Sequence, residues 1–173
     1  MSATSKVADS RDRLTIPELR RMNFEQLSDV YRSAKPPGSL SDLNGDARGA
    51  MLAWRSPATG PLARLLEAMG ASPKFPWEGK TFQSEHSDKG AGINRINLFT
   101  KMKWFPFSTR FDKSFLDGKP SFVLDYSGQG NPPLIAQIVD EVREVGPGVY
   151  MGPAAIKMSG KPRPVLFFAV YFP

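Results

Sequence analysis

The segment SFLDGKPSFVLDY, residues 114–126, carries the clearest signal for the fold. Its central dipeptide, Asp117-Gly118, is typical of tight hairpin turns, because these residue types tolerate the left-handed backbone angles that such a turn requires. Apolar residues lie on both sides of the dipeptide, at 115–116 and 122–124. The segment therefore predicts two antiparallel strands joined by a short turn.

A similar pattern extends over the chain after Gly70, where aromatic and β-branched residues are interrupted by Gly, Asn and Pro. Such runs are typical of strands bounded by turns. They predict strands near residues 78–84, 93–101, 103–111, 121–127, 149–157 and 164–172. Several short strands at close spacing indicate an antiparallel meander or barrel.

Residues 131–145 fit two patterns. Asn131-Pro132 suits the start of a helix, and a helical stripe of apolar residues follows at positions 134, 135, 138, 139 and 142. Val139, Glu141, Arg143 and Val145 also fall on alternate positions, as the residues on one face of a strand do. We favour a helical turn at about 132–138 that leads into a strand, over one continuous helix.

Helix starts occur near the N-terminus. Thr15-Ile16-Pro17-Glu18 and Asn23-Phe24-Glu25-Gln26 each place a capping residue three positions before Glu or Gln, which is the arrangement of a capping box. We expect a helix within about 16–34 that is broken near Asn23 and ended by the prolines at 36 and 37. A second helix is expected over 60–70, with Pro61 near its start and Gly70 at its end.

These signals predict a mainly β, α+β fold: an antiparallel barrel with N-terminal helices packed at one end. Residues 1–14 are expected to form a flexible tail, and residues 15–173 a single domain. Within that domain, residues 15–70 form the helical part and residues 75–173 the barrel. A total of 173 residues suits one domain of this kind.

The amino-acid composition excludes several kinds of functional site. The chain has no cysteine and one histidine, which excludes disulfides, cysteine nucleophiles, iron–sulfur clusters and sites with several histidine ligands. We therefore predict no metal and no cofactor. The single histidine, His86, lies in a polar segment that resembles a surface loop, so we expect His86→Ala to leave fold, ligand binding and activity intact.

The net charge of +6 is spread along the chain, with its densest basic patch from Arg95 to Lys119. A solvated face is the favoured interpretation of this patch, and nucleic-acid binding the less favoured one. The sequence shows no signal peptide and no run of about 20 apolar residues. We expect a cytoplasmic location without membrane insertion, and the oligomeric state stays open.

Candidate functional residues come from the strands. Tyr126 together with Asp140 or Glu141 is a candidate acid–base pair. Arg143 and Asn94 are candidates to orient a polar head group, because an inward charge in a barrel needs a partner. The expected ligand contacts further include Tyr150 as a hydrogen-bond donor, with Trp77, Phe82 and Trp104 lining an apolar cavity. Equally, the tyrosines and aromatic residues suit an ordinary core, and the charges an exposed face with ion pairs.

Short motifs in the last hundred residues resemble those of bacterial lipocalin-like barrel proteins. The motifs are Trp77-x-Gly79-Lys80-x-Phe82, Gly92-x-Asn94, Asp117-Gly118, Asp125-Tyr126 and the segment from Asp140 to Gly152. The resemblance implies an antiparallel barrel around an apolar pocket, with helices packed at one end.

The favoured hypothesis is a barrel that binds a small, largely apolar, lipid-like molecule carrying a polar or anionic group. The alternative is a cofactor-free enzyme (an isomerase, cyclase or hydrolase) that acts on an apolar molecule in the same cavity. A basic nucleic-acid-binding module is the third and weakest hypothesis.

Overall fold

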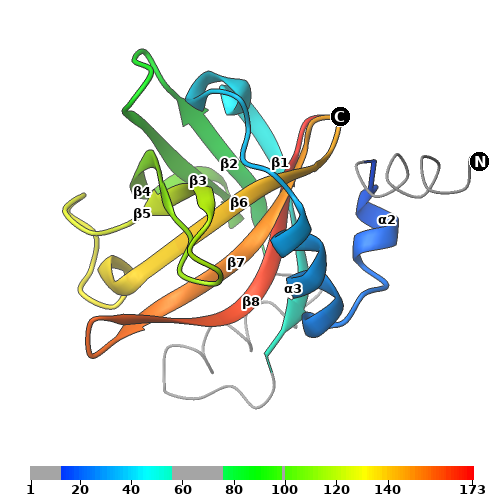
Figure 1. The fold of residues 1–173 in the computed structure, drawn as a ribbon. Helices are drawn as coiled ribbons and strands as arrows, with labels where there is room; N and C mark the ends of the chain where they lie inside the picture. The colour runs from blue at the N-terminus through cyan, green and yellow to red at the C-terminus, as the bar shows by residue number, and fades with distance from the viewer. Residues whose placement is uncertain (1–12, 56–75, 99) are drawn as a thin grey trace, which may run out of the picture.

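The computed structural model describes residues 13–55, 76–98 and 100–173. Within these residues, eight antiparallel strands form a closed barrel in which each strand pairs with its neighbours along the chain and β1 pairs with β8 (Figure 1). The bounds of the strands are β1 Gly45–Trp54, β2 Trp77–Gln83, β3 Gly90–Leu98, β4 Thr100–Lys113, β5 Pro120–Asp125, β6 Ile138–Gly146, β7 Val149–Met158 and β8 Lys161–Tyr171. The predicted antiparallel barrel is confirmed.

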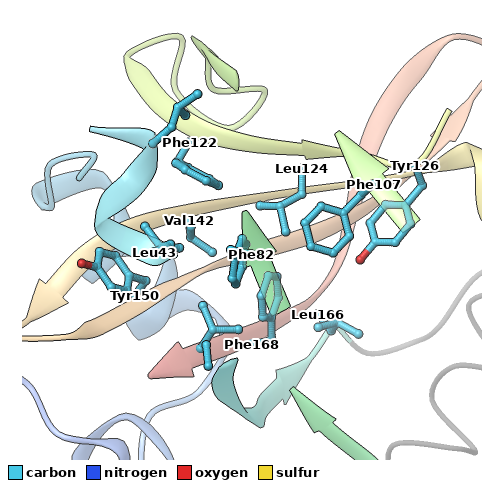
Figure 2. Close-up of a cluster of buried hydrophobic side chains, with 13 residues drawn as sticks. Leu43, Phe82, Phe107, Phe122, Leu124, Tyr126, Val142, Tyr150, Leu166 and Phe168 are labelled. Carbon is cyan, nitrogen blue, oxygen red and sulfur yellow. The ribbon is translucent and has the colours of Figure 1, made fainter. Parts of the chain in front are cut away.

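Alternation along the strands separates an inner from an outer face, because successive side chains of a strand point to opposite sides. The inner face holds a cluster of buried apolar side chains from several strands, including Phe82, Phe107, Phe122, Leu124 and Phe168 (Figure 2). Their rings meet edge to face, with centroid distances of 5.6 Å for Phe82–Phe107 and 6.0 Å for Phe82–Phe122. The barrel interior is therefore an aromatic core.

In the described part of the chain, the α-helices α2 and α3 precede the barrel and lie on its outer surface (Figure 1). α2 spans Ile16–Leu19 and α3 spans Phe24–Ser33, so the predicted break near Asn23 is confirmed. Asn23 accepts a hydrogen bond from the Gln26 amide at 2.9 Å, and the Gln26 side chain accepts one from the Asn23 amide at 3.0 Å. This capping box satisfies backbone donors that the first turn leaves without a helical partner.

The helices pack against the outer face of β6, β7 and β8 rather than across an end of the barrel. Leu19, Leu27 and Tyr31 bury themselves there against Met151 and Phe167. One end of the barrel is closed instead by the 3-10 helix η1, Leu40–Leu43, whose two leucines join the interior cluster. The position predicted for α2 and α3 is corrected accordingly.

The barrel begins earlier than the sequence predicted. Residues 45–54 form β1 and pair with both β2 and β8, whereas they were assigned to a helical part over 15–70. Gly45, Asp46 and Gly49 have low strand propensity, so their extended conformation depends on pairing with β2 or with β8. The helix predicted over 60–70 lies outside the described residues.

The remaining strand predictions agree with the structure. Strands β2 to β5, β7 and β8 coincide with the predicted segments to within a few residues. In the ambiguous segment, the short 3-10 helix η2, Ile135–Gln137, leads directly into β6. The favoured helical turn followed by a strand is thus confirmed. Among the helices of the described residues, none combines the length and the hydrophobicity that a membrane-spanning helix requires.

Candidate functional site

A lysine lies inside the barrel, among the aromatic rings. Lys80 belongs to β2, and the residue as a whole is 3% exposed. Its ammonium group donates hydrogen bonds to Asn94 Oδ1 at 2.9 Å, to Tyr126 Oη at 2.5 Å and to Asp140 Oδ2 at 3.1 Å. A buried charge of this kind is costly unless it is paired and hydrogen-bonded, and Lys80 is both.

Strand register explains why these four residues meet. Lys80 on β2 is directly opposite Asn94 on β3, and Asp140 on β6 is opposite Leu124 on β5. Tyr126 lies two positions after Leu124, so it points to the same inner face. Closure of the barrel then brings β2 and β3 across from β5 and β6. We call Lys80, Asn94, Tyr126 and Asp140 the interior network.

The interior network is closed by further hydrogen bonds. Tyr126 Oη donates to Asp140 Oδ2 at 3.1 Å, and Asn94 Nδ2 donates to Tyr126 Oη at 3.0 Å and to the Phe105 carbonyl at 3.1 Å. The Trp77 indole N–H donates to Asn94 Oδ1 at 3.1 Å. The second oxygen of Asp140, Oδ1, is buried and has no hydrogen-bond partner within the described part of the chain.

Aromatic faces surround the Lys80 ammonium. The distances from Nζ to the ring centroids are 5.1 Å for Phe107, 5.2 Å for Phe168, 5.3 Å for Tyr126 and 5.6 Å for Trp77. Cations are attracted to such faces within about 6 Å. The rings therefore favour the charge while excluding water from it.

Burial shifts the titration of the network. Removal from water lowers the pKa of Lys80, although the neighbouring Asp140 opposes that shift. Burial likewise raises the pKa of Asp140, against the opposing charge of Lys80. Burial and the Asp140 carboxylate hold the pKa of Tyr126 well above its usual value. All three shifts favour the neutral forms of these side chains, because burial disfavours charge.

Several predicted site residues come together in this network. Tyr126 is hydrogen-bonded to both Asp140 and Asn94, and the Trp77 indole N–H donates to Asn94. Phe82 lies in the adjoining aromatic cluster. The structure thus places five of the predicted residues in or beside one buried site.

Two other predicted contacts lie away from the network. Tyr150 lies at the opposite end of the interior cluster from Tyr126, close to Leu43 (Figure 2). Burial raises the pKa of Tyr150 to about 12. The side chain of Trp104 is 44% exposed and packs its ring against Phe105. Trp104 therefore does not line the interior as predicted.

Arg143 and Glu141 point to the outer face of β6, one position out of phase with Asp140. Arg143 forms a two-pronged ion pair with Asp117, at 2.7 and 2.8 Å, and donates to the carbonyls of Tyr31, Lys119 and Pro120. Its guanidinium is fully used in tying the β4–β5 turn and α3 to the barrel. The predicted role of Arg143 as an interior head-group contact therefore does not hold.

Glu141 likewise cannot serve the predicted acid–base pair with Tyr126. It accepts hydrogen bonds from the Tyr31 hydroxyl at 2.7 Å and from the Phe115 amide at 2.6 Å, both outside the barrel. Burial raises the pKa of Glu141. Asp140 is the carboxylate that meets Tyr126.

Lys80 is the functional candidate that the sequence analysis missed. A signal was present, because Lys80 lies two positions before Phe82, which was predicted to face the interior, and period-two alternation places both on the same face. Lysine is rarely buried, so a strand pattern alone favours exposure for such a residue.

The remaining polar candidates lie on the surface. His86 is exposed in the loop between β2 and β3, where its carbonyl accepts a hydrogen bond from the Ser84 hydroxyl at 2.7 Å. In the basic patch, Arg95 pairs with Asp46 at 3.2 Å and Arg110 with Asp112 at 3.1 Å. No group of three or more His, Asp or Glu side chains suited to a metal ion occurs among residues 13–55, 76–98 and 100–173.

Comparison with known proteins gives information about the fold and none about the function. No protein-family model matches the sequence, and no curated protein matches it. A solved structure of a protein from Thermomonospora curvata is similar, with a TM-score of 0.54 and 16% sequence identity. The match covers 98% of this chain and 95% of that chain. It supports a shared barrel architecture over nearly the whole length.

Proposed function

We propose that the protein binds a small, largely apolar molecule whose polar or anionic group is held by the interior network. The observation that carries this proposal is the Lys80 ammonium, buried at 3% exposure with three hydrogen-bond partners inside an aromatic barrel. Burying this charge is costly, and apolar residues of similar volume often stabilise a core equally well. The stability of the fold therefore gives no evident reason for the lysine. Recognition of a ligand supplies a reason for it.

The fold supports this proposal. Barrels of eight strands are just wide enough to hold one small ligand, and lipocalins use an antiparallel barrel in this way. A lipocalin-like mode of binding is therefore part of the proposal. The aromatic side chains would contact the apolar body of the ligand, and the network its polar group.

The chemistry of the network fits an oxygen-rich head group. Lys80, Tyr126 and Asn94 carry N–H or O–H donors that suit a carboxylate or carbonyl oxygen. The unpartnered Asp140 Oδ1 adds a buried acceptor for a hydroxyl or a carboxylic acid proton. With Asp140 in its neutral form, the charge of Lys80 is balanced by an anionic ligand.

Trp77 gives this site a connection to the surface. It lines a groove of about 550 Å³ on the barrel wall together with Gly49, Arg48 and Arg95. On its other side, its indole N–H binds Asn94 of the network. Trp77 thus lies between the groove and the interior network, and we expect its side chain to be displaced when a ligand enters.

Binding of naphthoic acid, an apolar ring system with one carboxylate, tests the proposal. We expect saturable binding to the wild-type protein by calorimetry, and at least about a tenfold loss of affinity in Lys80→Met, since a hydrogen bond to a charged group contributes about 1.5–3 kcal/mol. The matched control is Lys113→Met, which changes an exposed lysine of β4 and is expected to bind as wild type does.

Tyr126→Phe provides a second variant that keeps the ring and removes only the hydroxyl. It should also weaken naphthoate binding, which keeps the test decisive if Lys80→Met does not fold. Absence of saturable binding to the wild-type protein, or equal affinity in folded Lys80→Met and Lys113→Met, overturns the proposal.

A further inference from the structure

We propose that Lys80 is an amine nucleophile that forms a Schiff base with an apolar aldehyde or ketone bound in the barrel. This inference rests on the proposed function and narrows its ligand to a carbonyl compound. It gives Lys80 a covalent role, in addition to the hydrogen bonding that the proposed function assigns to it.

The surroundings of Lys80 match the needs of an imine-forming lysine. Such lysines are activated by removal from water within an apolar pocket, and Lys80 lies among four aromatic rings at 3% exposure. The reaction also needs a base for the ammonium proton and an acid for the carbonyl oxygen. Asp140 Oδ2 at 3.1 Å and Tyr126 Oη at 2.5 Å from Nζ provide these groups.

The first step is addition. Lys80 gives one ammonium proton to the Asp140 carboxylate, and the neutral amine attacks the carbonyl carbon, forming a C–N bond as the carbonyl π bond breaks. The carbonyl oxygen takes a proton from Tyr126, and the added nitrogen returns one to the tyrosinate. The product is a carbinolamine on Lys80.

The second step is loss of water. Asp140 returns its proton to the carbinolamine hydroxyl, which leaves as water while the nitrogen lone pair forms the C=N bond. The nitrogen of the resulting iminium ion faces the Asp140 carboxylate. Overall, one amine and one carbonyl compound give one imine and one water, and no oxidant or reductant is consumed.

Asp140 Oδ1 fits this sequence. It is a buried oxygen without a hydrogen-bond partner in the described residues, on the same carboxyl group whose Oδ2 binds Lys80 and Tyr126. A carbinolamine hydroxyl next to Lys80 would have this oxygen as an acceptor. The lowered pKa of Lys80 and raised pKa of Asp140 act in the same direction, toward a neutral amine beside a neutral acid.

Reductive trapping with naphthaldehyde tests the inference. The full-length protein is incubated with naphthaldehyde and cyanoborohydride, which reduces an imine to a stable secondary amine. Intact mass should rise by the mass of the aldehyde less one oxygen atom, and peptide mapping should place the adduct at Lys80 of the wild-type protein. Lys80→Arg should lose the adduct, Lys113→Arg should keep it, and Tyr126→Phe should form it more slowly.

Two matched compounds separate this inference from the proposed function. Naphthoic acid and naphthylmethanol share the ring system but form no imine. If they bind while the adduct is absent from Lys80 or spread over surface lysines, the Schiff-base inference is overturned and the binding function stands. If neither they nor the aldehyde binds, both fail. Mapping on the wild-type protein decides the matter even where Lys80→Arg does not fold.

Discussion

At the level of single residues, the pairing of Lys80 with Asp140 is the most consequential contact in the barrel. Both side chains are almost completely buried, at 4% and 5% exposure, and within the described residues they form an ion pair with each other. Taking either charge out of water costs several kcal/mol. Their attraction and hydrogen bonds offset that cost only while both are present.

A double-mutant cycle measures this dependence. Lys80→Met and Asp140→Leu should each lower the free energy of unfolding by about 3–5 kcal/mol, because each leaves a buried charge without its partner. The double variant should be less destabilised than the sum of the two, since it leaves neither charge behind. Urea unfolding at neutral pH measures all four proteins. Additive losses would show that the pair is not a unit.

The same residues show what sequence alone could predict about the site. Tyr126, Asp140 and Asn94 were singled out, and the structure brings them together. Glu141 and Arg143 were placed with them, although they lie on the opposite face of β6 from Asp140. A shift of one residue exchanges the two faces of a strand, and both faces of β6 are buried, one by the aromatic core and one by α3. Hydrophobic alternation therefore could not show which residues of β6 face the barrel interior.

At the level of elements, α3 is attached to the barrel through polar as well as apolar contacts. Tyr31 of α3 donates to Glu141 and is 2.7 Å from the hydroxyl of Ser121 on β5. The Arg143 guanidinium stacks on the Tyr31 ring at 4.3 Å from its centroid. Helix, strand and turn thus share one buried polar cluster outside the barrel, separate from the interior network.

This cluster predicts a pH-dependent effect of Glu141→Gln. Burial raises the pKa of Glu141, so the folded state holds its proton more tightly than the unfolded state does. Its contribution to stability is therefore fully present below its ordinary pKa of 4.5 and is lost as pH rises through the raised value. Relative to wild type, Glu141→Gln should gain free energy of unfolding as pH rises from 4 to 7.

Urea titrations at several pH values provide the measurement. Glu144→Gln is the matched control, because Glu144 is an exposed carboxylate of the same strand. A difference between Glu141→Gln and wild type that stays constant with pH, or that shrinks as pH rises, would contradict the prediction.

Helices, strands and turns were predicted correctly from the sequence where the local signals were strong. Capping residues fixed the helix break at Asn23, and Asp117-Gly118 fixed the β4–β5 turn, where Gly118 has a φ of +73°. β1 was missed because its first residues resemble a loop, and its extended form depends on β2 and β8, which are distant in sequence. When a strand is stabilised by such non-local pairing, its own local sequence does not predict it well.

At the level of the whole molecule, the two ends of the barrel differ. η1 closes one end with Leu40 and Leu43, which pack into the interior cluster. Toward the other end lie the interior network and several half-buried apolar residues that flank the cluster, among them Trp54, Trp77, Phe105, Ile138 and Val165. Among the described residues, fully buried leucines thus close one end, whereas buried polar groups and half-buried apolar residues lie toward the other.

Pairing of β1 with β8 has a consequence for hydrogen exchange. In an open sheet, the outer strands lose amide protons to solvent faster than central ones, because their ladders open locally. Here the first and last strands bond to each other from Arg48–Tyr171 to Trp54–Leu166. Amides of β1 and β8 in that ladder should therefore exchange as slowly as those between β4 and β5, at rates that follow global unfolding. Faster exchange along β1 and β8, measured by NMR in deuterated water, would mean that the ring opens at this seam before the rest of the barrel unfolds.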